Sequence, residues 1–448
     1  MEPARIPSRY TATPPTPAHI TTTESVHFGA DLLWFGANPS RTNPQVLSTF
    51  GRMVDDLGIR SVRFDVYWGL LEPQRGRYDW TLTDQLVNSV DRNTEIVFTL
   101  YSTSEWGSKY NECREMARER RGIDVYNRPP SSIPLRMSDY ANFLERIVNR
   151  YEHRVKYWQI ENEVYGSVFR EIPKCGHVNR FWVGTTQEYL TLLRESYMTI
   201  KQADPQATVF ASSFTFEPWP LRKDNPFLTY ILDAGRHYTD LIDVHLYLGV
   251  HEDPEKIAWL LAKLRGLGYS KPIWSTEVGQ IDIEYYGERS VNQMTSQQML
   301  TLQAEETVKR YVLAFASGVD RVFQLRISPY TDRERESRWT HMSLTYDKMG
   351  SRKRPGYYAL QTTIDKLEGF SEIKRISPTK YQFIVRGSPV FVLWTDQGQE
   401  TFDMSAMVRE ELVRRTEPFS VEGPPTTQTE RADSVRLTSI PAFFEPLE

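Results

Sequence analysis

The sequence has few of the features that mark several large classes of protein. Its 448 residues include only two cysteines, Cys113 and Cys175, so no disulfide framework is expected to hold the fold together. It contains no apolar run of about 18 residues, the length that crosses a bilayer, so we expect no membrane span. Its 54 basic and 58 acidic residues give a formal net charge of −4, which argues against a nucleic-acid or anionic-membrane partner.

Motifs for cofactors, metals and other hydrolases are also missing. No glycine-rich phosphate loop follows a predicted strand, and no Gly-x-Ser-x-Gly elbow occurs, which argues against dinucleotide enzymes and serine hydrolases of that type. The cysteines lack the C-x-x-C spacing, and His237, His245 and His251 lack the i, i+4 pairing of a helical metal site. We therefore expect neither a cofactor nor a metal ion.

The first 25 residues are rich in proline and threonine and lack the apolar stretch of a signal peptide. The protein is therefore either intracellular or exported with its signal removed, and the sequence leaves both open. Without a visible export signal, two free thiols are the expected state of Cys113 and Cys175. A disulfide that ties two loops together is the alternative for a secreted protein.

Three segments of the chain differ in pattern. Residues 1–25 are predicted to be an extended leader, residues 26–368 a catalytic α/β unit, and residues 369–448 a small β-rich accessory domain. The predicted strands of the middle segment are Val26–Phe35, Ser61–Val66, Glu95–Tyr101, Val155–Asn162, Ala207–Ser213, Leu241–Tyr247, Pro272–Glu277 and Val319–Ile327. The predicted helices are Asn43–Leu57, Thr83–Arg92, Ser138–His153, Thr186–Ala203, Pro226–Tyr238, Pro254–Leu267, Ser296–Ser317 and Gly356–Leu367. Eight strands alternating with eight helices predict a (β/α)8 TIM barrel.

Long loops follow the third, fourth and eighth predicted strands. They are Ser102–Arg136, Val164–Thr185 and Ser328–Arg354. In a barrel these loops lie on the C-terminal face, where active sites are built. A doubly wound open sheet is the alternative fold, but the strand count favours a closed one.

Two glutamates, Glu163 and Glu277, each come at the end of a short apolar run that is predicted to be a buried strand. A single glutamate at a strand end is more often a solvated loop carboxylate. Two of them on the fourth and seventh strands of a closed barrel would converge across its mouth. A pair of carboxylates in this arrangement is what cleavage of a glycosidic bond by double displacement requires.

Short motifs around these two residues resemble those of clan A glycoside hydrolases. The run Trp158–Glu163 resembles the strand-four motif of the clan, and Ile273–Gly279 resembles its strand-seven motif. The second strand with the loop after it and the His-x-Tyr motif on strand six also fit the clan, and the residues concerned are Ile59–Asp65, Trp68, Glu72-Pro73, Gly76–Trp80 and His245-Leu246-Tyr247. The resemblance covers about residues 26–368 and implies a barrel enzyme without a cofactor.

The residues of these motifs resemble more than one family of the clan. Gln159–Glu163 with Tyr165-Gly166 resembles the β-galactosidases of families 35 and 42. The Trp274–Gly279 run and Pro355–Leu360 are more similar to family 39 β-xylosidases and some family 5 enzymes. Strand eight, with Gln324-Leu325-Arg326, lacks the tryptophan that many members place there.

The resemblance also implies roles for individual residues. Glu163 would be the general acid/base and Glu277 the nucleophile. Arg63 and Tyr247 would hold Glu277 ionised, and Asn162 would bond the sugar 2-hydroxyl. For Arg63 the alternative is a structural salt bridge inside the barrel, and for Tyr247 and His245 it is a satisfied core hydrogen bond instead of a substrate contact.

Several tryptophans fall in predicted loops on the catalytic face, namely Trp68, Trp106, Trp182, Trp219 and Trp339. One or two of them, with Trp68 and Trp106 as the first candidates, would form platforms for sugar rings, although packing within the loops is the commoner use. Trp274 is three residues before Glu277, so strand alternation predicts that it packs between the barrel and its helices.

The expected partner is a carbohydrate, as an oligosaccharide, polysaccharide or simple glycoside. The long loops favour an exo-acting enzyme with a closed pocket, similar to a β-xylosidase, β-galactosidase or β-glucosidase. An endo-acting glycanase or a transglycosylase would use the same two glutamates, and a non-catalytic glycan-binding barrel is the alternative outside enzymes. The sequence does not indicate an oligomeric state.

Overall fold

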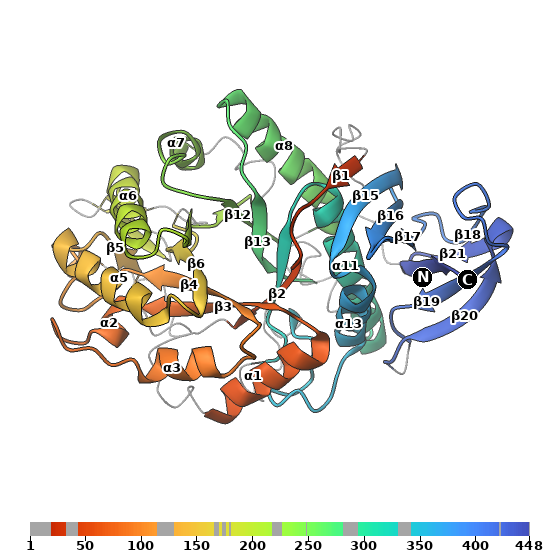
Figure 1. The fold of residues 1–448 in the computed structure, drawn as a ribbon, viewed down its shortest axis with the longest axis horizontal. Helices are drawn as coiled ribbons and strands as arrows, with labels where there is room; N and C mark the ends of the chain where they lie inside the picture. The colour runs from red at the N-terminus through yellow and green to blue at the C-terminus, as the bar shows by residue number, and fades with distance from the viewer. Residues whose placement is uncertain are drawn as a thin grey trace.

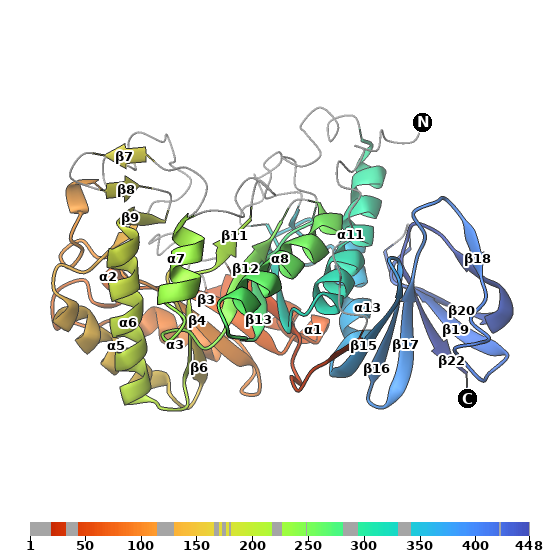
Figure 2. The same ribbon diagram turned by 90° about the horizontal axis from the view of Figure 1, so that it is seen from above.

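The structure is a computed structural model that describes residues 19–32, 44–113, 130–164, 170–172, 176–178, 181–216, 226–247, 249–280, 294–329, 342–420 and 423–447. It contains a curled group of strands surrounded by helices, with a second sheet at one side (Figure 1). Figure 2 shows the same two parts after a 90° turn, with helices α11 and α13 between them.

The curled sheet is parallel and contains the strands predicted for the barrel. They are β2 (Phe28–Leu32), β3 (Ser61–Tyr67), β4 (Glu95–Tyr101), β6 (Val155–Ile160), β10 (Thr208–Ala211), β11 (Phe214–Thr215), β12 (Ile242–Leu246), β13 (Ile273–Val278) and β14 (Arg321–Leu325). Their order is β10-β6-β4-β3-β2-β14-β13-β12-β11. The edge strands β10 and β11 are separated along the chain only by Ser212 and Ser213, so the two edges of the sheet come together. The fold is therefore TIM-barrel-like.

A helix follows each strand position of this sheet, as the sequence predicts. The helices are α1 (Pro44–Leu57), α3 (Thr81–Asn88), α5 (Met137–Tyr151), α6 (Thr186–Ala203), α7 (Pro226–Ala234), α8 (Asp253–Gly266), α11 (Ser296–Ala316) and α13 (Pro355–Leu367). Two of them begin with a capping box, in which Thr185 and Glu188 cap α6 and Thr295 and Gln298 cap α11. Helices α8 and α13 each have a proline in the first turn. Backbone N–H groups in the first turn have no acceptor within the helix, so proline, which lacks an N–H, loses no hydrogen bond there.

Trp274 lies inside the curl of the sheet and not between the sheet and its helices. It packs in a cluster with Val97, Phe210, Leu241 and Phe323, whose strands are not all neighbours and meet only across the interior. The prediction for Trp274 is therefore wrong. The reason is a register shift in β13 between Ser275 and Val278, where an extra residue puts Trp274 and Glu277 on the same side.

The second sheet is antiparallel and contains both an early and a late part of the chain. Its order is β1 (His19–Thr21), β15 (Phe370–Ser377), β16 (Lys380–Val385), β17 (Ser388–Leu393), β22 (Ala442–Pro446), β19 (Leu412–Glu417) and β20 (Thr426–Arg431). A short pair, β18 (Glu400–Phe402) and β21 (Val435–Leu437), lies beside it. Phe370 and Phe383 belong to the same hydrophobic cluster as the parallel sheet, so the two sheets share a core. The predicted domain boundaries stay predictions.

The loops after β4 and β6 build a small four-stranded sheet on the C-terminal side of the strands. Its order is β5 (Ser131–Ser132), β9 (Trp182–Gly184), β8 (Gly176–Val178) and β7 (Arg170–Ile172), and it projects from that side in Figure 2. Cys113, in the loop after β4, is bonded in a disulfide. The expectation of a free thiol at Cys113 is therefore wrong, while Cys175 lies outside the described residues.

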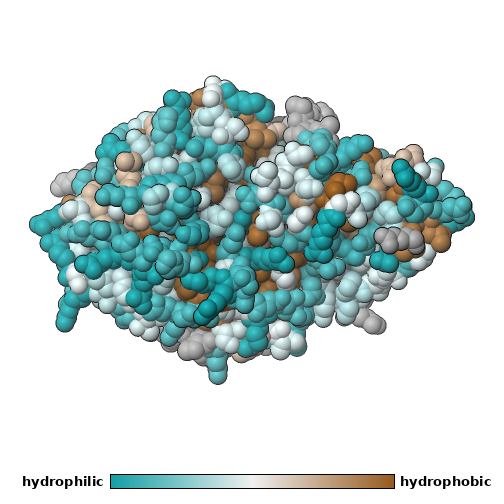
Figure 3. All heavy atoms as spheres, viewed as in Figure 1, coloured by the Kyte–Doolittle hydropathy of each residue, from teal (hydrophilic) through white to brown (hydrophobic). Residues whose placement is uncertain are grey.

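The face of the molecule in Figure 3 is predominantly hydrophilic, with apolar residues exposed in small separate areas. The large apolar side chains that are exposed are Leu135, Met198, Tyr230, Tyr346, Met349 and Leu412, and of these only Tyr346 and Met349 are close along the chain. Within the described part of the chain, no helix combines the length and apolar character needed to cross a membrane.

Candidate active site

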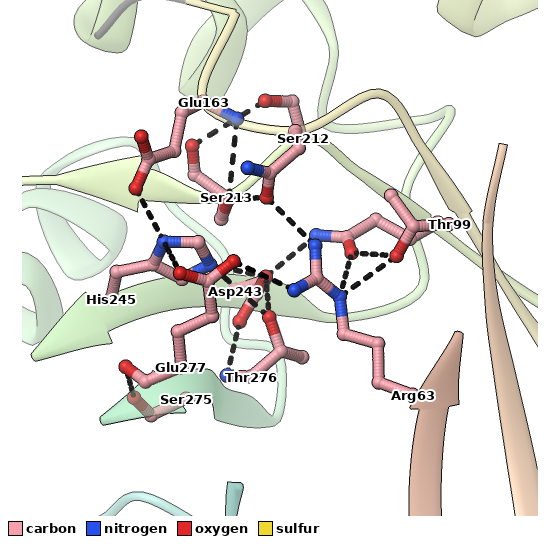
Figure 4. A network of polar contacts seen from close by, with 12 residues as sticks. Arg63, Thr99, Glu163, Ser212, Ser213, Asp243, His245, Ser275, Thr276 and Glu277 are labelled. Atoms are coloured by element: carbon pink, nitrogen blue, oxygen red, sulfur yellow. Dashed lines mark hydrogen bonds and ion pairs between the residues drawn. The ribbon is translucent and has the colours of Figure 1, made fainter. Parts of the chain in front are cut away.

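Glu163 and Glu277 lie at the same end of the curled sheet. Glu277 is the penultimate residue of β13, and Glu163 follows the end of β6 by three residues. Both are therefore at the C-terminal ends of parallel strands. A carboxylate oxygen of Glu163, one of Glu277 and a ring nitrogen of His245 all lie within 4.8 Å of one another. Figure 4 shows the two carboxylates on either side of the His245 ring.

A strained turn positions Glu163. Glu161 and Glu163 both have left-handed backbones, with φ of 67° and 41°, which is uncommon for residues other than glycine. The buried Glu161 carboxylate accepts hydrogen bonds from the backbone N–H and the hydroxyl of Ser102, at 2.7 and 2.6 Å. These bonds fasten the turn to the loop after β4. Such strain costs of order 1–3 kcal/mol and is typical of functional sites.

Arg63 is fully buried at the centre of the site and connects its residues. Its Nη1 donates to Glu277 Oε1 at 2.7 Å and to Asp31 Oδ2 at 2.5 Å. Its remaining donors reach three side chains, Asn162 at 2.7 Å, Thr99 at 2.8 Å and Gln159 at 3.0 Å. The guanidinium therefore both neutralises Glu277 and bonds a structural carboxylate, so the two interpretations of Arg63 apply together.

Glu277 is held in its ionised form. Burial opposes ionisation, but the charges of His245 and Arg63, together with hydrogen bonds from Tyr247 and Arg63, outweigh it and lower the pKa of Glu277. The Tyr247 hydroxyl donates to Glu277 Oε2 at 2.5 Å. Both carboxylate oxygens thus have a fixed donor, which orients the group and favours an anion.

His245 lies between the two glutamates. Its Nδ1 is 2.6 Å from Glu163 Oε1 and 3.4 Å from Glu277 Oε2. Burial alone would lower the pKa of His245, but the charges of Glu277 and Glu163, the hydrogen bond to Glu163 and the charge of Asp243 raise it to about 9. At neutral pH the ring is therefore an imidazolium. His245 thus contacts both glutamates, and a substrate contact through His245 stays a prediction.

Asn162 has its oxygen occupied and its nitrogen available. Its Oδ1 accepts from Arg63 Nη2 at 2.7 Å and from Ser213 Oγ at 3.0 Å. Because Arg63 can only donate, these bonds fix the orientation of the amide. Nδ2 makes no hydrogen bond with the described residues, so the amide can donate to a hydroxyl group of a bound molecule.

The sequence matches a family model described as "Beta-galactosidase" of glycoside hydrolase family 42 over residues 37–206. Three of the solved structures that share the fold illustrate the similarity. A family 39 glycoside hydrolase from Bacteroides cellulosilyticus WH2 has a TM-score of 0.60 at 15% identity, with 94% of this chain and 80% of that chain covered. A family 39 β-xylosidase from Caulobacter crescentus has a TM-score of 0.58 at 14% identity, covering 98% of both chains. A glucosidase from Croceicoccus marinus has a TM-score of 0.59 at 12% identity, with 96% and 97% covered.

The chain is a clan A glycoside hydrolase. The family match covers the segment that contains Arg63, Asn162 and Glu163. No curated protein matches the sequence. At 12–15% identity the solved structures establish the fold of the hydrolase and not its substrate.

Trp68 does not present a face to a sugar in this hydrolase. It is fully buried in the short helix α2 (Trp68–Leu71), where its Nε1 donates to Glu72 Oε2 at 2.7 Å and its ring packs edge-on against Tyr140. This burial argues against the predicted substrate contact through Trp68. Trp106 packs against Trp68 and donates to the Glu72 carbonyl oxygen at 2.6 Å, but it is only half-buried, so its role stays a prediction. Trp182 is buried, and Trp219 and Trp339 lie outside the described residues.

Two buried aspartates of the site are absent from the residues selected by sequence. Asp31, on β2, lies directly beside Arg63 in the register of the sheet. Asp243, on β12, accepts hydrogen bonds from the backbone N–H of Thr276 at 2.9 Å, from its hydroxyl at 2.6 Å and from Gln159 Nε2 at 2.6 Å. The sequence offers one clue to them, because each is the only carboxylate in its strand.

Glu163, His245 and Glu277 are the one group of histidine and acidic side chains in the described part of the chain that is close enough to bind a metal ion. A histidine can bind a metal ion only when its imidazole ring is neutral. The raised pKa of His245 therefore sets a metal ion in competition with a proton at this position. The geometry is better suited to moving a proton between neighbouring groups.

Proposed function

We propose that the hydrolase is a retaining β-glycosidase that acts by double displacement. The observation that carries this proposal is the distance of at most 4.8 Å between carboxylate oxygens of Glu163 and Glu277. Retaining enzymes have carboxyl groups about 5–5.5 Å apart, whereas inverting enzymes need about 6.5–9.5 Å to admit a water molecule between them. The short separation favours direct attack by one carboxylate.

The environments of the two glutamates suggest which one attacks. Glu277 is buried and ionised, with Arg63 and Tyr247 fixing its two oxygens, so it is the nucleophile that forms the glycosyl ester. Glu163 is more accessible and accepts no bond from a guanidinium of the described residues, which suits a group that exchanges a proton with substrate and water. Asn162 Nδ2 would donate to the sugar 2-hydroxyl and stabilise the transition state.

The substrate we propose is a neutral β-linked carbohydrate that is cleaved from one end. The small sheet β5-β9-β8-β7 rises on the side of the strand ends and would close one side of the binding site. The names of two structures with the same fold, a β-xylosidase and a glucosidase, are consistent with this class. We also infer a fully closed (β/α)8 barrel with residues 369–448 as an accessory β-domain.

Hydrolysis of a panel of aryl β-glycosides tests this function. The wild type is expected to release the phenol from at least one sugar, and Glu277→Ala should lose activity by a factor of about 10⁴ or more, because the nucleophile is removed. Glu105→Ala is the matched control, since Glu105 is an exposed glutamate in a loop at the same end of the barrel. Turnover that survives in Glu277→Ala would refute the assignment, and inactivity on all substrates would favour a glycan-binding barrel.

The stereochemistry of the product provides an independent test. Proton NMR of the first product formed should show the β-anomer before mutarotation. A 2-deoxy-2-fluoro glycoside with a good leaving group should leave a covalent adduct whose mass maps to the peptide that contains Glu277. Initial release of the α-anomer would show inversion and contradict the proposal. Transfer of the sugar to an added sugar acceptor in preference to water would identify a transglycosylase.

A further inference from the structure

The hydrogen bonds around the His245 ring determine where its protons lie. On one side, the Thr276 hydroxyl donates to Asp243 Oδ2 at 2.6 Å, so a lone pair of Thr276 Oγ1 faces His245 Nε2 at 3.3 Å. Nε2 therefore carries a hydrogen in every charge state. On the other side, Nδ1 faces Glu163 Oε1 at 2.6 Å. One proton lies on the line between Nδ1 and Oε1, and either group can hold it.

We propose that His245 stores the catalytic proton in the resting enzyme, and that Glu163 carries it between the His245 ring and the glycosidic oxygen. This proposal rests on the retaining mechanism proposed above and adds a third catalytic group to it. It differs from a mechanism in which Glu163 itself holds the proton before the reaction.

The charges that surround the ring favour this location. The ring is fully buried and faces three carboxylates, Glu163 at the end of β6, Asp243 on its own strand and Glu277 on β13. Arg63, a cation of the same network, has its guanidinium occupied by Glu277 and Asp31. Tyr247, which also lies beside the ring, is held neutral because burial and the charge of Glu277 raise its pKa. The raised pKa of His245 agrees with this balance.

In the first step, Glu277 attacks the anomeric carbon and the bond to the leaving oxygen breaks. Glu163 gives a proton to that oxygen and receives the proton of His245 Nδ1. The site then contains a neutral Glu277 ester, a neutral His245 and an ionised Glu163. In the second step, water attacks the anomeric carbon, its proton passes through Glu163 to Nδ1, and the ester bond breaks. Each proton that leaves the ring is thereby returned.

The ester itself controls the proton affinity of the ring. The charge of Glu277 is the largest single contribution that favours the imidazolium form, and it disappears when the ester forms. The ring then loses affinity for the proton in the step that delivers it, and regains affinity when hydrolysis restores the carboxylate. A carboxylate at this distance changes a neighbouring pKa by about 1–3 units.

NMR of enzyme with ¹⁵N-labelled histidine tests the proposal directly. In the resting wild type, both ring nitrogens of His245 should be protonated at pH 7.5, with titration near pH 9. In Glu277→Gln, and in the 2-fluoroglycosyl adduct of the wild type, the pKa of His245 should fall by about 1–3 units. The signal is assigned by its loss in His245→Asn, and His237→Asn, which removes an exposed ring, is the control that leaves it unchanged.

A neutral His245 in the resting enzyme at pH 7.5 would overturn the proposal, as would a pKa that Glu277→Gln does not change. In either case His245 would only position Glu163. These two measurements need no substrate, so they are separate from the proposed function, whose failure would appear as absent turnover and no covalent adduct. The same pKa should also appear as the basic limb of the kcat/KM profile of the wild type and be lost in His245→Asn.

Discussion

Asp31 and Glu277 accept hydrogen bonds from the same nitrogen of Arg63, at 2.5 and 2.7 Å. Two carboxylates on one donor would repel each other if both were ionised. Burial, followed by the charge of Glu277, raises the pKa of Asp31 well above its ordinary value even though Arg63 opposes the shift. The pKa values of the pair are therefore divided in direction, since that of Glu277 is lowered and that of Asp31 is raised.

The first prediction concerns this division. Asp31→Asn should lower the free energy of unfolding by about 1 kcal/mol, since the amide has the same shape and keeps an acceptor oxygen for Arg63. Asp31→Ala should cost about 2–3 kcal/mol more, because it removes an acceptor from the buried guanidinium and leaves a cavity. Urea denaturation at pH 7 measures both. Equal losses in the two variants would contradict the prediction.

The second prediction concerns the hydroxyl that holds the nucleophile. Tyr247→Phe removes a hydrogen bond to an ionised group, worth about 1.5–3 kcal/mol, so kcat/KM should fall roughly 10- to 100-fold. The bond favours the ionised form of Glu277, so its loss raises the pKa of Glu277. The acidic limb of the kcat/KM profile should therefore move to higher pH. A limb that stays in place would show that Tyr247 does not act through Glu277.

The third prediction concerns stability and pH at the opposite end of the strands. Burial raises the pKa of Glu368 to about 7, although the carboxylate accepts hydrogen bonds from the backbone of His27 and Phe28. The folded state thus binds a proton more tightly than the unfolded state. The stabilisation is complete below the unfolded value, near pH 4.5, and is lost as pH rises through 7.

Glu368→Gln should remove this dependence. The amide keeps an acceptor for the two backbone groups but does not titrate, so melting temperatures between pH 5 and 8 should change less in the variant than in the wild type. The residual slope should have the same sign, because burial also raises the pKa of Asp320 to about 6. An unchanged slope would exclude Glu368 as its source.

The fourth prediction separates packing from substrate binding at Trp68. Trp68→Ala should lower the free energy of unfolding by about 3–5 kcal/mol, as expected for a large buried aromatic residue. Trp68→Phe should restore most of the stability, and KM for the best aryl glycoside should stay within about twofold of the wild type in that variant. A large increase in KM with normal stability would mean that the indole contacts the sugar.

The strands and both glutamates can be predicted from the sequence because they depend on short, local patterns. Apolar runs that end in a carboxylate or amide are visible without knowing the partner strands, and Glu163 and Glu277 follow from them. The positions of Asp31 and Asp243 could not be recovered in the same way. Each is meaningful only beside Arg63 or Thr276, which lie in other strands, so the register of the sheet was needed.

The errors have physical causes of the same kind. Alternation predicts the wrong side for Trp274 because strict alternation holds only in a regular strand, and β13 contains an extra residue. Trp68 was expected in an open loop, but a helical turn begins at that residue and directs the indole inward against Tyr140. The disulfide of Cys113 depends on loop geometry that no local pattern encodes.

The pairing of β1 with β15 joins two distant stretches of the chain before the first barrel strand begins. Between β1 and β2, Glu24 pairs with Arg321 at 3.1 Å, and the start of β2 is bonded by Glu368. Peeling the antiparallel sheet away would thus also release the entry to the parallel one. The two sheets should melt as one cooperative unit, so calorimetry would record a single transition. Deletion of the residues up to Thr21, which removes β1, should therefore also lower the temperature at which the enzyme loses activity.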